Sequence, residues 1–231
     1  MSPHVAATTP YPWPYDGDLA GGATALLAVA PADTVSADVR LREVVERLST
    51  AVDAAGGLVV AATTARAPRR AGHVDPPGDP ADSLDPADSL DPADTVGPLG
   101  GPARSQAGPA GGGALGLLAG AVVHEVVLAG GIDAFYGSDL DLLLRTRGIE
   151  RRLLAGIGLE TCVHSTMRTA NDRGYECLLV VDACAPVDPG LVPAAVSMIE
   201  MSGGIFGAIG RSADVLAALS PADLTPEGAL T

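Results

Sequence analysis

Short apolar runs that alternate with helix-forming stretches are the feature that most restricts how this 231-residue chain can fold. The run TALLAVA, from Thr24 to Ala30, lies between glycine and proline, and a second such run spans Leu58 to Thr63. Unbroken apolar runs of this length are typical of strands buried on both faces of a parallel sheet. Between the two runs, Asp38 can cap a helix that has apolar residues at helical spacing and that can end at Gly56.

The same alternation continues through the second half of the chain. We expect strands at 122–128, 152–156, 175–181 and 205–209, and helices at 138–147, 162–173, 191–201 and from Ser212 onward. Strands that alternate with helices in this way predict an α/β fold, a doubly wound, mainly parallel sheet flanked by helices. Ligands of such sheets bind outside the carboxyl ends of the strands.

The length predicts a single domain, residues 1–231, with two irregular parts. The segment PYPWPYDG belongs to an N-terminal arm, residues 1–22, where alternating prolines favour an extended, polyproline-like chain. Residues 73–113 contain DPADSL, DPADSL and DPADTV in tandem, with too few large apolar side chains to offset the entropy of ordering. We interpret them as a low-complexity, disordered insertion. A calcium-binding repeat is the alternative, although the copies lack a glycine turn to wrap an ion.

The charge and the cysteine content exclude several classes of partner. A formal net charge of −14 opposes binding to nucleic acid or to an anionic membrane. The longest apolar run, Ala114 to Val123, is too short to span a bilayer. No signal-peptide pattern opens the chain, and three cysteines without framework spacing favour a reducing compartment, so we expect a cytoplasmic protein. Neither a cofactor nor a metal site is predicted.

Cys162 is the residue best placed to carry chemistry, because it lies at the end of a predicted strand and at the N-terminus of the predicted helix 162–173. Unpaired N–H groups and the positive end of the helix dipole would favour a thiolate there and would stabilise an oxyanion beside it. A small buried cysteine at a strand-to-helix turn is the competing interpretation. Position alone does not separate the two.

The sequence around Cys162 resembles one enzyme family. The run GIGLETCVHSTMRTANDRGYECLLVVDACA is similar to the nucleophile segment of the isochorismatase-like cysteine hydrolases, and among them it is closest to the biuret amidohydrolases. The stretches AAVSMIEMSGGIFGAIG and PYPWPY, and more loosely DAFYGSDLDLLLR, also match that subgroup. The resemblance implies an isochorismatase-like hydrolase fold, hydrolysis of small amide or ureide C–N bonds through an acyl-cysteine, a catalytic Cys, Asp and Lys, and a homotetramer.

Carried over position by position, the resemblance makes Cys162 the nucleophile but leaves its catalytic partners without functional side chains. The general-base Asp would stand at Ala30, and the Lys, six residues before Phe135, would stand at Ala129. No lysine occurs anywhere in the chain, since all 14 basic residues are arginine. In hydrolase triads, the loss of one orienting member costs roughly four orders of magnitude in turnover.

Other positions complete the site that the resemblance implies. A cis peptide between Ile157 and Gly158 would open the oxyanion pocket. Asp33, Ser202 and Phe135 are possible substrate-side residues, and Ser202 stands where the subgroup has a glutamine.

Further side chains are weaker substitutes for the missing base and cation. Asp33 lies three residues past Ala30 and is favoured as a turn or cap residue. His164 points roughly away from Cys162 on the predicted helix, and His124 precedes the segment that would hold the Lys. We expect a structural role for Asp182, a buried strand position for Cys177 and a place at the edge of the site for Cys184.

Two functions stay open on the sequence. The chain is either a pseudoenzyme that keeps the fold and an oligomer interface, or an active amidohydrolase that uses an unrecognised base such as Asp33 or a residue of a partner subunit. Ala30, Ala129 and the absence of lysine favour the pseudoenzyme. In either case we expect a homo-oligomer, or a hetero-oligomer with an active paralogue, and a small amide or ureide as the substrate of an active form.

Overall fold

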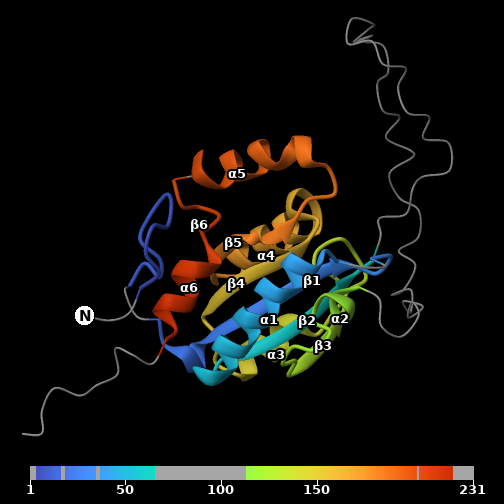
Figure 1. Ribbon diagram of the computed structural model, residues 1–231, viewed down its shortest axis with the longest axis horizontal. Helices are drawn as coiled ribbons and strands as arrows, with labels where there is room; N and C mark the ends of the chain where they lie inside the picture. Colours follow the sequence, from blue (N-terminus) through green and yellow to red (C-terminus); the bar gives the residue numbers. More distant parts are fainter. Residues whose placement is uncertain (1–3, 17–18, 35–36, 66–112, 202, 221–231) are drawn as a thin grey trace, which may run out of the picture.

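The computed structural model describes residues 4–16, 19–34, 37–65, 113–201 and 203–220 (Figure 1). The DPADSL repeats and the predicted insertion 73–113 lie outside these residues, apart from Gly113, and so does Ser202. No helix within the described ranges is long and apolar enough to cross a membrane. The apolar run that starts at Ala114 instead contains the short helix α2, Ala114–Leu117.

A six-stranded parallel sheet forms the centre of the molecule, in the order β3-β2-β1-β4-β5-β6. Its strands are β1 (Thr24–Pro31), β2 (Leu58–Thr64), β3 (Glu125–Leu128), β4 (Arg151–Ile157), β5 (Glu176–Ala185) and β6 (Ala208–Gly210). The direction in which successive strands are added reverses between β1 and β4, which are hydrogen-bonded neighbours. Such a reversal opens a crevice at the carboxyl ends of the two strands. The prediction of a doubly wound, parallel α/β fold is confirmed.

Helices cover both faces of the sheet. α1 (Val39–Ala54), α2 and α6 (Ser212–Ala218) pack over one face, while α3 (Leu140–Thr146), α4 (His164–Asp172) and α5 (Val192–Met201) pack over the other. In Figure 1, α1 and α6 lie in front of the strands, and α5 stands at the top, apart from the other helices. Helix α1 begins where the sequence predicts, because the Asp38 carboxylate accepts a hydrogen bond from the Arg40 N–H at 2.7 Å.

Two predicted strands begin later than expected. β3 starts at Glu125 because His124 uses its ring for pairing, with Nδ1 accepting a hydrogen bond from the Val59 N–H at 2.9 Å. β6 is shorter than the predicted strand 205–209. Glycines turn the chain before it, and Gly207 has φ +111°, a conformation that interrupts an extended strand.

The N-terminal arm lies along the edge of the sheet. Thr9 and Ile209 exchange two backbone hydrogen bonds, N to O 3.0 and 2.7 Å, so the arm pairs antiparallel with β6. Val5 and Trp13 form a second antiparallel bridge within the arm, and the Trp13 side chain is fully buried. An edge strand with unpaired N–H and C=O groups promotes aggregation, and here the arm covers it.

Candidate functional site

Cys162 lies just after the chain leaves β4, at the edge of the sheet where the strand order reverses between β1 and β4. After Ile157, the last residue of β4, the chain forms a π-helical turn, Leu159–Val163. The predicted helix therefore does not start at Cys162, since α4 begins two residues later at His164. Gly158 makes this entry possible: its φ is +84°, and a Cβ at this position would lie only 2.9 Å from Cys162 Sγ. A larger residue would therefore crowd the sulfur.

The Cys162 thiol is buried and neutral. The residue is 2% exposed, and Sγ donates a hydrogen bond to the Ile157 carbonyl at 2.8 Å. Burial raises the pKa of this thiol to about 11. The hydroxyls of Thr64 and Thr161 and the N–H groups of Val163 and of Cys162 itself lower the pKa by hydrogen bonding to the thiolate, but burial outweighs them. None of these groups carries a charge.

Of the two interpretations that position alone left open for Cys162, these surroundings agree with a small buried cysteine rather than with a resting thiolate. Backbone N–H groups do face the sulfur, as the sequence argument required, but the cost of desolvating a charged sulfur is larger than their effect on the pKa of Cys162. A nucleophilic role for this thiol depends on a base that removes its proton.

The two positions that the resemblance assigns to Asp and Lys are buried alanines at the carboxyl edge of the sheet. Ala30 pairs with Thr63 on β2, and the Ala129 N–H donates to the Thr63 carbonyl at 2.9 Å. Ala30 packs in the apolar cluster beneath α1 and α2, whereas Cys162 packs in the cluster on the other face. The fold thus brings Ala30, Ala129 and Cys162 to one edge of the sheet, but neither alanine side chain can accept or donate a proton.

Thr64, which was not predicted from the sequence, is one of the two residues whose hydroxyl acts on the Cys162 sulfur, together with Thr161. Thr64 ends β2, and its buried hydroxyl has no hydrogen-bond partner among the described residues in the resting thiol form. Alternation along β2 directs Thr64 to the same side as Val60 and Ala62, which pack in one cluster with Cys162. This alternation can be read in the sequence, so the signal for Thr64 was present there.

Of the three predicted substrate-side residues, the structure describes Asp33 and Phe135. Asp33 is exposed in the turn after β1, and Ser202 is outside the described residues. Phe135 is buried in the core and stacks on Tyr175, with the ring centroids 6.2 Å apart. Its surroundings are those of a core side chain.

Neither histidine considered as a substitute base is placed to serve Cys162. His164 is buried, burial lowers its pKa, and its Nε2 has no hydrogen-bond partner in the described part of the chain. His124 lies at the amino edge of the sheet, and its Nε2 is 3.0 Å from the Asp53 carboxylate. Both of its ring nitrogens are therefore engaged in holding β3 to β2 and α1.

The surroundings of Asp182 and of the other two cysteines indicate that these residues support the fold. The Asp182 carboxylate accepts hydrogen bonds from the N–H and the hydroxyl of Ser212, both at 2.7 Å, and so fixes the start of α6. Cys177 is fully buried in β5. Cys184 lies near the carboxyl end of β5, paired with Gly156 of β4, and burial raises the pKa of its thiol.

The cis peptide implied between Ile157 and Gly158 is absent from this structure. The cis bonds within the described ranges are Thr9–Pro10 and Trp13–Pro14. The left-handed conformation of Gly158 makes the turn instead, and its N–H donates to the Ala185 carbonyl at 2.8 Å.

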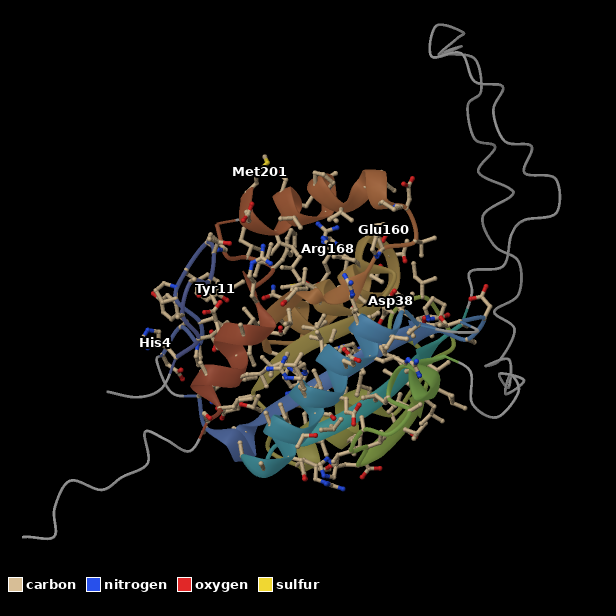
Figure 2. All side chains as sticks on the ribbon, viewed as in Figure 1. His4, Tyr11, Asp38, Glu160, Arg168 and Met201 are labelled. Atoms are coloured by element: carbon tan, nitrogen blue, oxygen red, sulfur yellow. The ribbon has the colours of Figure 1, made fainter. Side chains whose placement is uncertain are left out.

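Glu160 connects the turn that holds Cys162 to the segment before α5. Its carboxylate accepts hydrogen bonds from the N–H groups of Val187 and Asp188, with Oε1 at 2.9 and 2.6 Å. Figure 2 shows Glu160 below the start of α5. The position of α5 and the geometry of the Cys162 turn are therefore coupled through one side chain.

In the described ranges, no group of three or more His, Cys, Asp and Glu side chains could hold a metal ion.

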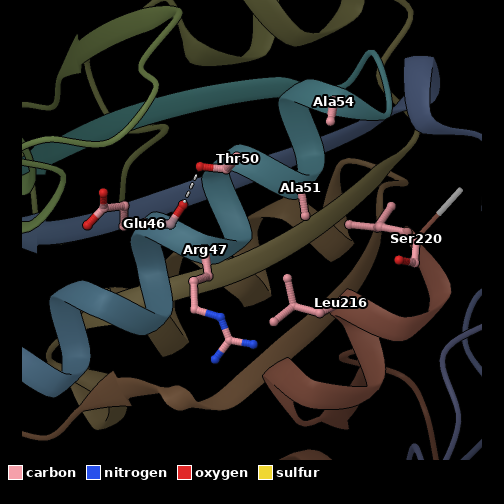
Figure 3. Close-up of a pocket in the computed structure, with 8 residues that line it drawn as sticks. Glu46, Arg47, Thr50, Ala51, Ala54, Leu216 and Ser220 are labelled. Atoms are coloured by element: carbon pink, nitrogen blue, oxygen red, sulfur yellow. Dashed lines mark hydrogen bonds between the residues drawn. The ribbon is translucent and has the colours of Figure 1, made fainter.

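A cavity of about 460 Å³ lies between α1 and α6, on the other face of the sheet from the Cys162 turn (Figure 3). Arg47 lines this cavity together with apolar side chains such as Leu216.

Comparison with known sequences identifies the family. The isochorismatase domain matches residues 27–210 of this chain. The isochorismatase family protein YecD of Escherichia coli O157:H7 is 46% identical over 52 residues, which are 22% of this chain and 28% of YecD. The ureidoacrylate amidohydrolase RutB of Methylorubrum extorquens is 37% identical over 87 residues, 37% of this chain and 34% of RutB. The matches thus span about a quarter to a third of the length of these curated relatives.

Solved structures agree with the fold. An isochorismatase family protein from Burkholderia thailandensis, 25% identical, superposes with a TM-score of 0.56 over 86% of this chain and 96% of that chain. A nicotinamidase from Bacillus subtilis, 21% identical, superposes with a TM-score of 0.52 over 78% and 96%. Since the domain match runs from within β1 to the end of β6, this chain belongs to the isochorismatase family and has the scaffold of its hydrolases.

Proposed function

We propose that this chain is an isochorismatase-family cysteine hydrolase scaffold in which the hydrolysis of small amide and ureide C–N bonds at Cys162 is lost or strongly impaired. The state of the thiol carries the proposal. Cys162 Sγ donates its proton to the Ile157 carbonyl, and the groups that act on its pKa in the described part of the chain are uncharged.

The chemistry of amide hydrolysis explains why this arrangement is a poor catalyst. Attack would form a bond between Cys162 Sγ and the substrate carbonyl carbon, and the sulfur proton would have to reach the leaving nitrogen before the C–N bond breaks. Water would then release the acid and regenerate the thiol. A positioned base normally carries that proton, and a cation or a hydrogen-bond donor stabilises the developing charge. A backbone carbonyl is too weak a base for the first task, and the alanines at positions 30 and 129 supply neither function.

As a pseudoenzyme, the chain would act through binding. It would associate with further copies of itself or with an active paralogue, and it would retain the crevice at the ends of β1 and β4 as a place for a small amide or ureide. Ureidoacrylate, from the name of one relative, and biuret, from the resemblance around Cys162, are the first compounds to test.

The test is ammonia release by the full chain from biuret and ureidoacrylate, compared with its Cys162→Ser variant. We expect the two proteins to be indistinguishable, while an active ureidoacrylate amidohydrolase in the same assay shows turnover. Wild-type turnover clearly above that of Cys162→Ser would contradict the proposal and support the active amidohydrolase. The Asp33→Asn variant would then distinguish the candidate general bases of that active enzyme. Loss of turnover would identify Asp33 as the base, and retained turnover would assign this role to another residue, such as one from a partner subunit.

A further inference from the structure

The cavity between α1 and α6 plays no part in the proposed function. Its volume of about 460 Å³ falls within the range of about 300–1,000 Å³ that small-molecule sites occupy. The sheet separates this cavity from Cys162, which packs in the cluster on the other face. A molecule bound between α1 and α6 would therefore not be a substrate of the Cys162 site.

Small side chains leave the space between the two helices open. The residues of α1 that line the cavity follow one face of the helix at the spacing i, i+3, i+4 and i+7, namely Arg47, Thr50, Ala51 and Ala54. Leu216 of α6 lines the cavity from the other side, together with Leu219 and Ser220, which follow that helix. Because an alanine side chain ends at Cβ, the two alanines of α1 do not reach across to these residues, and the wall that they form is apolar.

Arg47 adds a positive charge to this apolar wall. Figure 3 shows its side chain extending from α1 into the space beside Leu216, whereas the Glu46 carboxylate points away from α6. Within the described part of the chain, Arg47 forms no ion pair. The Thr50 hydroxyl is already engaged, since it donates to the Glu46 carbonyl at 3.0 Å. The cavity thus combines an apolar wall with a guanidinium that a ligand can reach.

We propose that this cavity binds small organic monocarboxylates, with the carboxylate on Arg47 and the apolar body between Ala51 and Leu216. A guanidinium can donate two parallel hydrogen bonds to a carboxylate, and burial of the apolar body against the alanines and leucines adds to the affinity. A ligand with one negative charge fits better than one with two, because the net charge of −14 repels anions and one arginine lines the cavity.

Such a ligand would hold the end of α6 against α1. The Asp182 carboxylate already fixes the start of α6 through its hydrogen bonds to Ser212. The ligand would add a contact at the opposite end, where Leu216 and Leu219 line the cavity. Because a ligand that binds only the folded chain stabilises it by mass action, bound carboxylate should also raise the melting temperature.

The experiment is an NMR titration of the ¹⁵N-labelled full chain with hexanoate and with hexan-1-ol, which has the same chain length but no charge. We expect saturable shifts at residues of α1 and α6, a Kd for hexanoate of about 1–10 mM, and binding of hexan-1-ol that is weaker by about 5-fold. Hexanoate has no amide bond, so the outcome is separate from the proposed loss of hydrolysis at Cys162.

Three variants assign the binding to this cavity. Arg47→Gln should weaken hexanoate by about 5-fold, whereas Arg40→Gln should leave it unchanged, because Arg40 is an exposed arginine of α1 that does not line the cavity. Ala51→Leu should remove binding by filling the space while it keeps the charge of Arg47. Circular dichroism checks that each variant is folded, and Ala54→Leu replaces Ala51→Leu if that variant unfolds.

Three results would overturn the proposal. The absence of saturable shifts at α1 and α6 would show that the cavity does not bind carboxylates. Equal affinities of the wild-type chain and Arg47→Gln, or of hexanoate and hexan-1-ol, would remove the role of the charge. Unchanged binding by the folded space-filling variant would place the ligand outside the cavity.

Discussion

Ionisation of Cys162 is the property that most directly tests the proposed inactivity. The thiol has a pKa of about 11 in place of 9.0, so the protein disfavours the thiolate by roughly 3 kcal/mol. At about pH 8, roughly 0.1% of this thiol is ionised, against roughly 10% of a thiol at the reference value. We expect iodoacetamide to alkylate Cys162 about 100-fold more slowly in the native chain than in the urea-unfolded chain at that pH.

The pH profile separates ionisation from simple shielding. Mass spectrometry reports the alkylation rate of Cys162 at each pH, and shielding lowers the final rate without moving the midpoint. Thr64→Val should raise the midpoint further, because it removes a donor to the thiolate at nearly constant volume, whereas Thr64→Ser should leave it in place. A midpoint below about 8.5, the value of a free thiol, would refute the reasoning and would justify a wider search for substrates.

The same pKa has a consequence for stability, and two further variants test the packing. As pH rises above 9.0 the unfolded chain ionises at Cys162 first, so this group's contribution to stability is full below 9.0 and is lost as pH passes about 11, as a urea titration would show. Gly158→Ala should lower the urea midpoint more than Gly56→Ala: both glycines have positive φ, but only at Gly158 would the new Cβ approach Cys162 Sγ, and equal losses would contradict this. Arg152→Met should raise the free energy of unfolding by about 1–4 kcal/mol, because the buried guanidinium has no hydrogen-bond partner in the described structure, and a loss of stability would show that its contact with the Tyr175 ring matters more.

Local sequence patterns predicted most of the fold. The unbroken apolar runs identified β1 and β2, and Asp38 gave the start of α1 to the residue. Errors arose where a side chain or a glycine replaces regular pairing. The His124 ring accepts a hydrogen bond from the Val59 N–H, which shortens β3. A hydrophobicity pattern cannot predict that hydrogen bond.

The candidate site was predictable in its position but not in its electrostatics. The order of strands and helices placed Cys162 at the carboxyl edge of the sheet, and the structure agrees. The N–H groups that favour a thiolate can be counted from the sequence, but the atoms that exclude water from the sulfur cannot. Burial depends on residues far apart in the chain, such as Thr64 on β2 and Val163 after β4, which only the folded structure brings together.

The pairing of Thr9 with Ile209 sets a condition on how this protein is made. The two residues are 200 positions apart, so the arm, which is synthesised before β6, cannot pair until β6 has left the ribosome. Until then, β6 is missing and the arm has no strand to join. Any shortened product that ends before β6 would leave the outer edge of β5 open to other chains, which makes incomplete synthesis a specific route to aggregation for this fold.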